Sequence, residues 1–202
     1  MKRLILYIYL IFISISVQAY GEDISNFEID GISIGESALK YFNEKEILKE
    51  IEENAYMYDY LKDPKKFGHV VVRQGLTDYS FVILFVSLNN KYTIEGVSGN
   101  LNQTIVSKND LQKCLKKMKE VEEVFSQIFN KYDKYEDVGI HPIDSTGRSK
   151  VHYIQFIFQT GDSAQTQCYD FEEELRMSNN WVDGLSVTVR KKEVRNWLTN
   201  RK

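Results

Sequence analysis

The sequence predicts an α+β fold, in which helices pack on one face of an antiparallel sheet. Three observations support this prediction: amphipathic helical stretches, short runs of β-branched and aromatic residues, and turns of only a few residues between those runs. A parallel pair of strands needs a crossover of about a dozen residues, so strands joined by such short turns must pair antiparallel. Helices that precede or follow these strands can then cover the sheet.

The first helical segment lies within residues 36–55, and we expect it to break at Asn43. Asn43 stands three residues before Glu46, which is the pattern of an N-cap with its reciprocal partner. Three predicted strands follow, with the sequences "HVVVRQ", "YSFVILFVSL" and "YTIEGVSG". The close spacing of the last two predicts a hairpin.

Residues 107–132 form the clearest predicted helix, because their apolar residues recur at intervals of three and four. A second series of strands follows, with the sequences "VHYIQFIFQ", "AQTQCYDF" and "LSVTVR", and residues 191–200 are predicted to close the chain as a helix. A helix followed by three strands therefore occurs twice. One interpretation is a single domain, 20–202, that contains tandem units at 36–99 and 109–190.

Residues 1–19 are predicted to be a secretory signal peptide. Two basic residues open the segment, an uncharged run of 14 residues follows from Leu4 to Val17, and Ala19 supplies a small residue at the expected cleavage site. A transmembrane helix needs about 20 apolar residues, so this run is short for a span, and a retained anchor is the alternative interpretation. We therefore expect an exported protein, periplasmic or secreted.

The mature chain would be mildly acidic. Two of the 26 basic residues lie in the predicted leader, which leaves 24 basic against 29 acidic residues. This balance argues against nucleic acid as a partner. Apolar residues make up 43% of the sequence and the charges are dispersed, which predicts a folded chain. No second apolar stretch is long enough to span a membrane.

Cys114 and Cys168 are the two cysteines of the chain. An even count in an oxidising compartment favours one disulfide, and closing a loop of about 55 residues would contribute about 4 kcal/mol on the chain-entropy estimate. Two unpaired buried thiols are the alternative, because the sequence does not show whether the residues meet. The sequence lacks CxxC and HxxxH spacings, so we expect neither a metal site nor a cofactor.

The stretch "GISIG" has the spacing of a serine-hydrolase nucleophile elbow centred on Ser33. Such an elbow requires a buried strand before the serine and earlier strands to supply an oxyanion donor. The residues before Ser33 are instead "FEID", and the predicted sheet is antiparallel. We therefore expect a turn in which Ile32 and Ile34 pack inward and Gly35 or Ser37 opens a helix.

Exposed aromatic residues are the most plausible basis for an activity. The chain has 13 tyrosines, and Trp181 lies in the polar stretch "MSNNWVDG". Tyrosine and tryptophan present rigid apolar area with a polar tip, which suits recognition. Trp181, Tyr56, Tyr58 and Tyr60 are the candidate binding residues, and the alternative is that such aromatics pack on the second face of the sheet.

Several segments together resemble an uncharacterised family of small exported proteins from AT-rich marine alphaproteobacteria: "FEIDGISIGESALKYF", "YTIEGVSGNL", "KNDLQKCLKKMKEV", "QCYDF" and "LSVTVRKKEVRNWL". The resemblance implies an exported α+β protein and adds weight to Cys114 and Cys168 belonging to one structural scheme. The order of elements is also similar, more loosely, to periplasmic modules of outer-membrane-assembly lipoproteins and of β-lactamase inhibitors. The chain lacks the lipidated cysteine of those lipoproteins.

These observations lead to one hypothesis and one alternative. The hypothesis is a non-enzymatic binding module that recognises a protein or a cell-envelope component. The alternative is an exported hydrolase whose site is assembled from distant residues, for example His141, Asp144 and His152. The absence of a recognisable catalytic motif favours the first.

Overall fold

The computed structural model describes residues 24, 27–88, 91–101, 111–179 and 181–202, so the predicted signal peptide at 1–19 lies outside the described residues. Within them the chain forms an α+β fold with a seven-stranded antiparallel sheet, as predicted. The strand order is β3-β4-β5-β9-β8-β7-β6. The strands are β3 (Phe67–Val72), β4 (Tyr79–Ser87), β5 (Ile94–Leu101), β6 (Tyr132–Ile140), β7 (Lys150–Phe158), β8 (Ser163–Asp170) and β9 (Gly184–Arg190).

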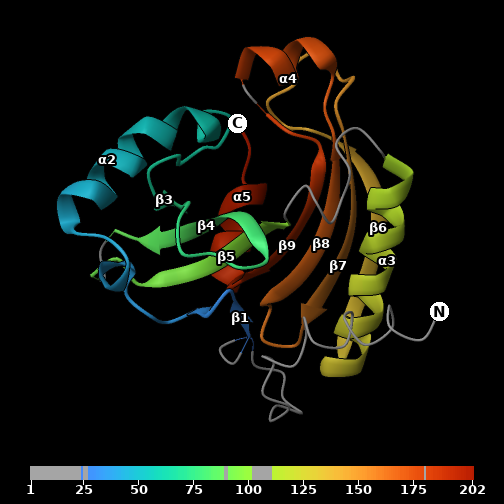
Figure 1. Cartoon of the computed structure of the whole chain (residues 1–202), viewed down its shortest axis with the longest axis horizontal. Helices are drawn as coiled ribbons and strands as arrows, with labels where there is room; N and C mark the ends of the chain where they lie inside the picture. The colour runs from blue at the N-terminus through green and yellow to red at the C-terminus, as the bar shows by residue number, and fades with distance from the viewer. Residues whose placement is uncertain (1–23, 25–26, 89–90, 102–110, 180) are drawn as a thin grey trace.

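Two successive stretches of chain build the two sides of this sheet. The strands β3 to β5 form one side, the strands β6 to β9 form the other, and the pairing of β5 with β9 joins them. The strand direction rotates strongly from one side of the sheet to the other. In Figure 1, β4 and β5 (green) run roughly horizontally, whereas β7 and β8 (orange) run roughly vertically. The second stretch has four strands, where the sequence predicted three.

One face of the sheet carries the main core. It is covered by α2 (Glu44–Asn54) and α3 (Leu111–Ile128), and Ile47 of α2 and Phe125 of α3 are fully buried in the same apolar cluster. The apolar stripe predicted for α3 is confirmed, since Cys114, Met118 and Val121 are also buried. The α3 helix runs beside β7 and β8 in Figure 1.

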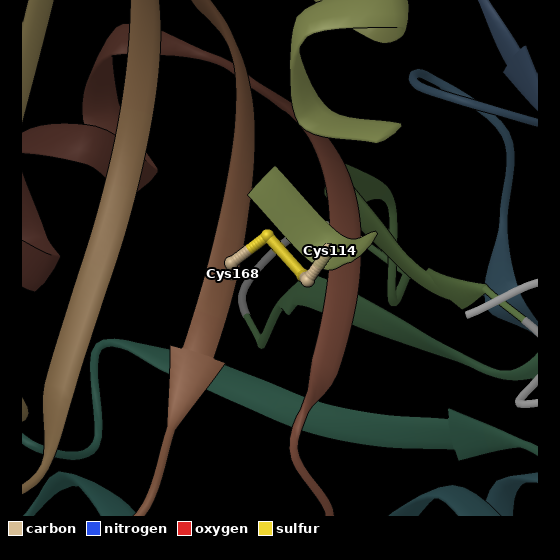
Figure 2. Close-up of a disulfide and its surroundings, with 2 residues drawn as sticks. All are labelled: Cys114 and Cys168. Atoms are coloured by element: carbon tan, nitrogen blue, oxygen red, sulfur yellow. A yellow bond between two sulfur atoms is a disulfide. The ribbon is translucent and has the colours of Figure 1, made fainter. Parts of the chain in front are cut away.

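The disulfide joins α3 to the sheet beneath it. Cys114 bonds to Cys168 of β8, and both residues are almost completely buried (Figure 2). Alternation along β8 directs Ala164, Thr166 and Cys168 toward α3, which places the second cysteine under the helix. The predicted pairing of the two cysteines is therefore confirmed, and the alternative of two free thiols is wrong.

The final helix lies on the opposite face of the sheet, contrary to the expectation that all helices share one face. Trp197 of α5 (Lys192–Thr199) packs on Phe67 and Phe85, with ring centroids 5.4 Å and 6.3 Å away. Phe67 and Phe85 point away from the main core because Gly68 and Val86 beside them face α2. The sheet is thus apolar on both faces at this end, and a second cluster forms under α5.

The residues before α2 form a small cap on the main core. A short pair of strands, β1 (Glu28–Ile29) and β2 (Ile32–Ser33), leads into the 3₁₀ turn η2 (Ala38–Lys40). Ile32 and Ile34 are buried and the Ser37 side chain accepts a hydrogen bond from the Leu39 amide, as predicted. The predicted capping box of Asn43 and Glu46 is also present at the start of α2.

Two further segments complete the chain: the 3₁₀ turn η3 (Ala55–Tyr58) after α2, and the short helix α4 (Glu173–Asn179) between β8 and β9. In the part of the chain that the structure describes, no helix is long and apolar enough to cross a membrane.

Candidate functional site

A cavity of about 330 Å³ lies on the side of the sheet opposite α3. Both halves of the chain contribute to it, with η3, β3 and β4 on one side and the ends of β6 and β8 and the start of β9 on the other. We call it the aromatic cavity. It is lined by Asn54, Tyr56, Met57, His69, Val71, Arg73, Ser80, Phe81, Ile83, Asn100, Leu101, His141, Tyr169, Phe171, Trp181, Val182, Asp183, Gly184 and Leu185.

One wall of the aromatic cavity is a stack of rings from three segments. The His141 ring lies 5.1 Å from the rings of both Phe171 and Trp181, and these two lie 4.9 Å from each other. Tyr169 stacks almost parallel on Phe171, at 5.2 Å. Such offset and tilted contacts hold aromatic side chains in fixed orientations. This wall is therefore preorganised.

Hydrogen bonds to backbone groups hold the connection between β8 and β9, which carries Trp181. The Trp181 amide donates to the carbonyl of Arg176, in the last turn of α4, at 3.0 Å. The Asp183 carboxylate accepts a hydrogen bond from the amide of Phe171 at 2.8 Å, which holds the two ends of this connection together. Trp181 consequently lies half-buried against its neighbours, although the sequence predicted it to be exposed.

The opposite wall comes from η3 and from the outward-facing residues of β3 and β4. Tyr56 and Met57 of η3, His69 of β3 and Ile83 of β4 line this part of the cavity. His69 is 4% exposed, and its Nδ1 lies 2.7 Å from the hydroxyl of Tyr58. A buried imidazole with a hydroxyl partner stays in place without a counter-charge.

The aromatic cavity is close to neutral in charge. Burial lowers the pKa of His69 to about 4, assisted by the Arg73 cation. Burial also lowers the pKa of His141 to about 4, although the Asp144 carboxylate opposes the shift. Both imidazoles are therefore uncharged at neutral pH. The guanidinium of Arg73 is compensated by Glu50, at 2.7 Å.

The structure brings two of the four predicted binding residues together. Trp181 and Tyr56 line opposite walls of the aromatic cavity, and Tyr56 is 54% exposed. The other two lie elsewhere. Tyr58 is buried against Trp197, with ring centroids 4.7 Å apart, and Tyr60 is half-buried with the Arg201 guanidinium over its ring. For Tyr58 the expectation of exposure was wrong, because its ring fills the cluster under α5.

The three residues of the hydrolase alternative are not brought together as a site. His141 faces the aromatic cavity, whereas His152 lies beside Leu115 and Met118 of α3, on the other face of the sheet. The Asp144 carboxylate is occupied by the turn that it organises, since it accepts the amide of Thr146 at 2.7 Å and that of Ser149 at 2.6 Å. The hydrogen bond from the Thr146 hydroxyl, at 2.6 Å, together with that from the Ser149 amide, holds the pKa of Asp144 well below its usual range.

Ser33 lies on β2, where its hydroxyl donates to the Glu28 carboxylate at 3.2 Å. The sharp turn around it is formed by Gly31 and Gly35, both at positive φ, and not by a strand passing into a helix. Within the described residues, no group of three or more His, Cys, Asp or Glu side chains is placed to hold a metal ion.

Sequence reasoning missed Tyr169 and Phe171, and it named His141 only for the hydrolase alternative. The alternation "QTQCY" in β8 was the available signal, because it places Tyr169 on the face opposite Cys168. His141 and Phe171 stand at the ends of β6 and β8. Their meeting depends on strand pairing that no local pattern specifies.

No protein-family model matches the chain, and neither a curated protein nor a solved structure is similar to it at a significant level.

Proposed function

We propose that this chain is an exported, non-enzymatic binding module that takes an apolar group of a protein or cell-envelope component into the aromatic cavity. One observation carries the proposal: Trp181 and Tyr56, from distant parts of the sequence, line the same cavity on the face of the sheet opposite α3. The disulfide and the predicted leader fit an oxidising compartment outside the cytoplasm.

The lining favours a neutral, mostly apolar group. Aromatic and aliphatic side chains form the walls, and the two uncharged imidazoles offer hydrogen bonds without attracting an ion. A volume of about 330 Å³ is at the small end of ligand sites. A guest that loses roughly 150 Å² of apolar surface there would gain about 4 kcal/mol, which suits the recognition of one group of a larger molecule.

The two tryptophans allow a direct test. Trp181 lines the cavity, whereas Trp197 is 3% exposed and its indole N–H donates to the Asp63 carbonyl. We would titrate the protein with N-phenyl-1-naphthylamine, a neutral apolar fluorophore, and follow tryptophan emission. Saturable quenching of Trp181 is expected. Trp181→Phe should remove most of that quenching, because Trp197 lies in the core beneath α5.

Matched variants separate binding in the cavity from binding at any exposed ring. Tyr56→Ala and Trp181→Ala should each weaken binding by about tenfold, the effect of losing a large aromatic contact. Tyr135→Ala is the control, because Tyr135 is 52% exposed on β6, close to the 54% of Tyr56, but lies outside the cavity. Equal loss in all three variants, or no saturable binding by the wild type, would refute the proposal.

A further inference from the structure

Arg190, at the end of β9, is a cation that has no carboxylate partner among the residues that the structure describes. It projects on the same face of the sheet as the aromatic cavity but does not line that cavity. One nitrogen, Nη2, donates to the side-chain oxygen of Gln165, and Nε is buried without a hydrogen-bond partner in the described part of the chain. No described carboxylate forms an ion pair with it.

The surroundings of Arg190 are polar but not anionic. Three phenols, those of Tyr58, Tyr60 and Tyr169, are the groups whose charge would favour the guanidinium. Burial raises the pKa of all three above the ordinary tyrosine value, so they are neutral at physiological pH. The nearby Arg195 is a second cation, which further disfavours the charged guanidinium.

Amide side chains spread this charge without cancelling it. Gln165 accepts from Arg190 and donates to the oxygen of Gln167, which in turn donates to the hydroxyl of Tyr169. Each amide presents its oxygen toward the cation, so the row is polarised in one direction. Dipoles of this kind lower the cost of a buried charge, but the net charge of the group remains +1.

A second donor without a partner lies directly beside Arg190. Ser163 is its register neighbour on β8, and the Ser163 hydroxyl is buried with no hydrogen-bond partner among the described residues. On the other side, β5 presents Gly96, where an added Cβ would lie 3.1 Å from the Cβ of Arg190. Two unsatisfied donors therefore belong to register-paired residues on one face of the sheet, and a glycine leaves room for the arginine stem on the neighbouring strand.

We propose that Arg190 and Ser163 form a binding site for an oxyanion group, either a carboxylate or a tetrahedral phosphate or sulfate. Leaving a buried charged donor unpaired is costly, and an oxyanion supplies both the missing charge and two acceptors. Arginine suits this role because its planar donors match the edge of such groups. The site is separate from the aromatic cavity and does not depend on the function proposed for it.

The test uses the purified, oxidised protein with sodium phosphate, sulfate and acetate, each compared with sodium chloride at equal ionic strength. The NMR signal of the Arg190 Nε–H, assigned by its absence from the Arg190→Lys variant, should shift saturably with at least one oxyanion. A stronger response to phosphate and sulfate would identify a tetrahedral group, and a stronger response to acetate would identify a carboxylate. No saturable shift with any of them would overturn the proposal and leave water as the partner of these donors.

Variants assign the binding to these residues. Arg190→Lys keeps the charge but loses the planar donor pair, so affinity should fall by about tenfold or more. Ser163→Ala should weaken binding severalfold with little change in shape, which keeps the assignment testable if the first variant folds poorly. Arg148→Gln, at an exposed arginine in the turn before β7, is the control. Isothermal titration that finds Arg190→Lys and Ser163→Ala binding as tightly as the wild type would place the anion elsewhere.

Discussion

Acidification should destabilise this fold before its carboxylates are protonated. The two imidazoles of the aromatic cavity each have a folded-state pKa of about 4, compared with an ordinary value of about 6.5. As the pH falls below 6.5, the unfolded chain takes up protons at these positions and the folded chain does not. The unfolded state is therefore favoured, and stability is lost progressively between about pH 6.5 and pH 4.

His69 allows a magnitude to be worked out, because it is 4% exposed and solvent screening is small. The shift from 6.5 to about 4 corresponds to about 2 kcal/mol of lost stability at pH 5 and about 3 kcal/mol near pH 4. His141 is half-buried, so its contribution should be smaller. Urea unfolding at a series of pH values measures the sum.

A variant isolates the contribution of one ring. His69→Asn keeps a polar group near the hydroxyl of Tyr58 but removes the titration, so its stability should depend less steeply on pH by about 2 kcal/mol between pH 8 and pH 5. The absolute stability of the variant does not matter for this comparison. A wild type whose free energy of unfolding is constant across this window, or a variant with the same slope, would refute the reasoning.

Three further predictions follow from single features of the chain. Reduction of the Cys114–Cys168 disulfide, which closes a separation of 54 residues, should lower the free energy of unfolding by about 4 kcal/mol, and a Cys114→Ala/Cys168→Ala variant should no longer respond to reductant in urea melts. Gly99→Ala should cost about 1–3 kcal/mol in the same assay, because the new Cβ would lie 2.4 Å from the Tyr79 ring, whereas Gly184→Ala, with nothing within 4 Å, should not show this packing penalty. Export from a bacterial host should remove residues 1–19, so that intact mass and N-terminal sequencing begin at Tyr20, and a retained leader would contradict the signal-peptide prediction.

The elements that could be predicted from the sequence are those whose buried apolar residues repeat at the spacing of a helix or a strand. The stripe of α3 and the capping box at Asn43 were both visible as local patterns, and the structure confirms them. Pairing of the cysteines was also predictable, because compartment and an even count favour it independently of geometry.

The strand β6 was missed for a physical reason. It is an edge strand whose residues are mostly exposed on both faces, so its sequence "YDKYEDVGI" has no alternation of apolar and polar residues. It pairs with β7 along its whole length, and ion pairs link it to α3, including Lys134 with Glu122 at 2.6 Å and Lys119 with Glu136 at 2.8 Å. Interactions of this kind leave no periodic signal, and the preceding helix was consequently predicted to extend as far as residue 132.

The candidate site was only partly predictable, because it depends on how the two halves of the sheet meet. Trp181 and Tyr56 could be chosen as aromatic residues in polar surroundings, but their convergence follows from the pairing of β5 with β9. The burial of Tyr58 likewise follows from α5 crossing to the second face of the sheet. Neither event is encoded by residues close in sequence.

The composition of that second face supports recognition rather than simple exposure. Along β5, β9 and β8 its residues are Gly96, Ser98, Asn100, Ser186, Thr188, Arg190, Ser163, Gln165, Gln167 and Tyr169. A sheet face that only meets water usually carries lysine and glutamate, whereas this one has a single charged residue and short neutral polar groups. Several of them are buried although no helix of the main core covers them. Along these three strands the face is more polar than a core and carries fewer charges than an open surface, which fits the oxyanion site proposed at Arg190 and Ser163.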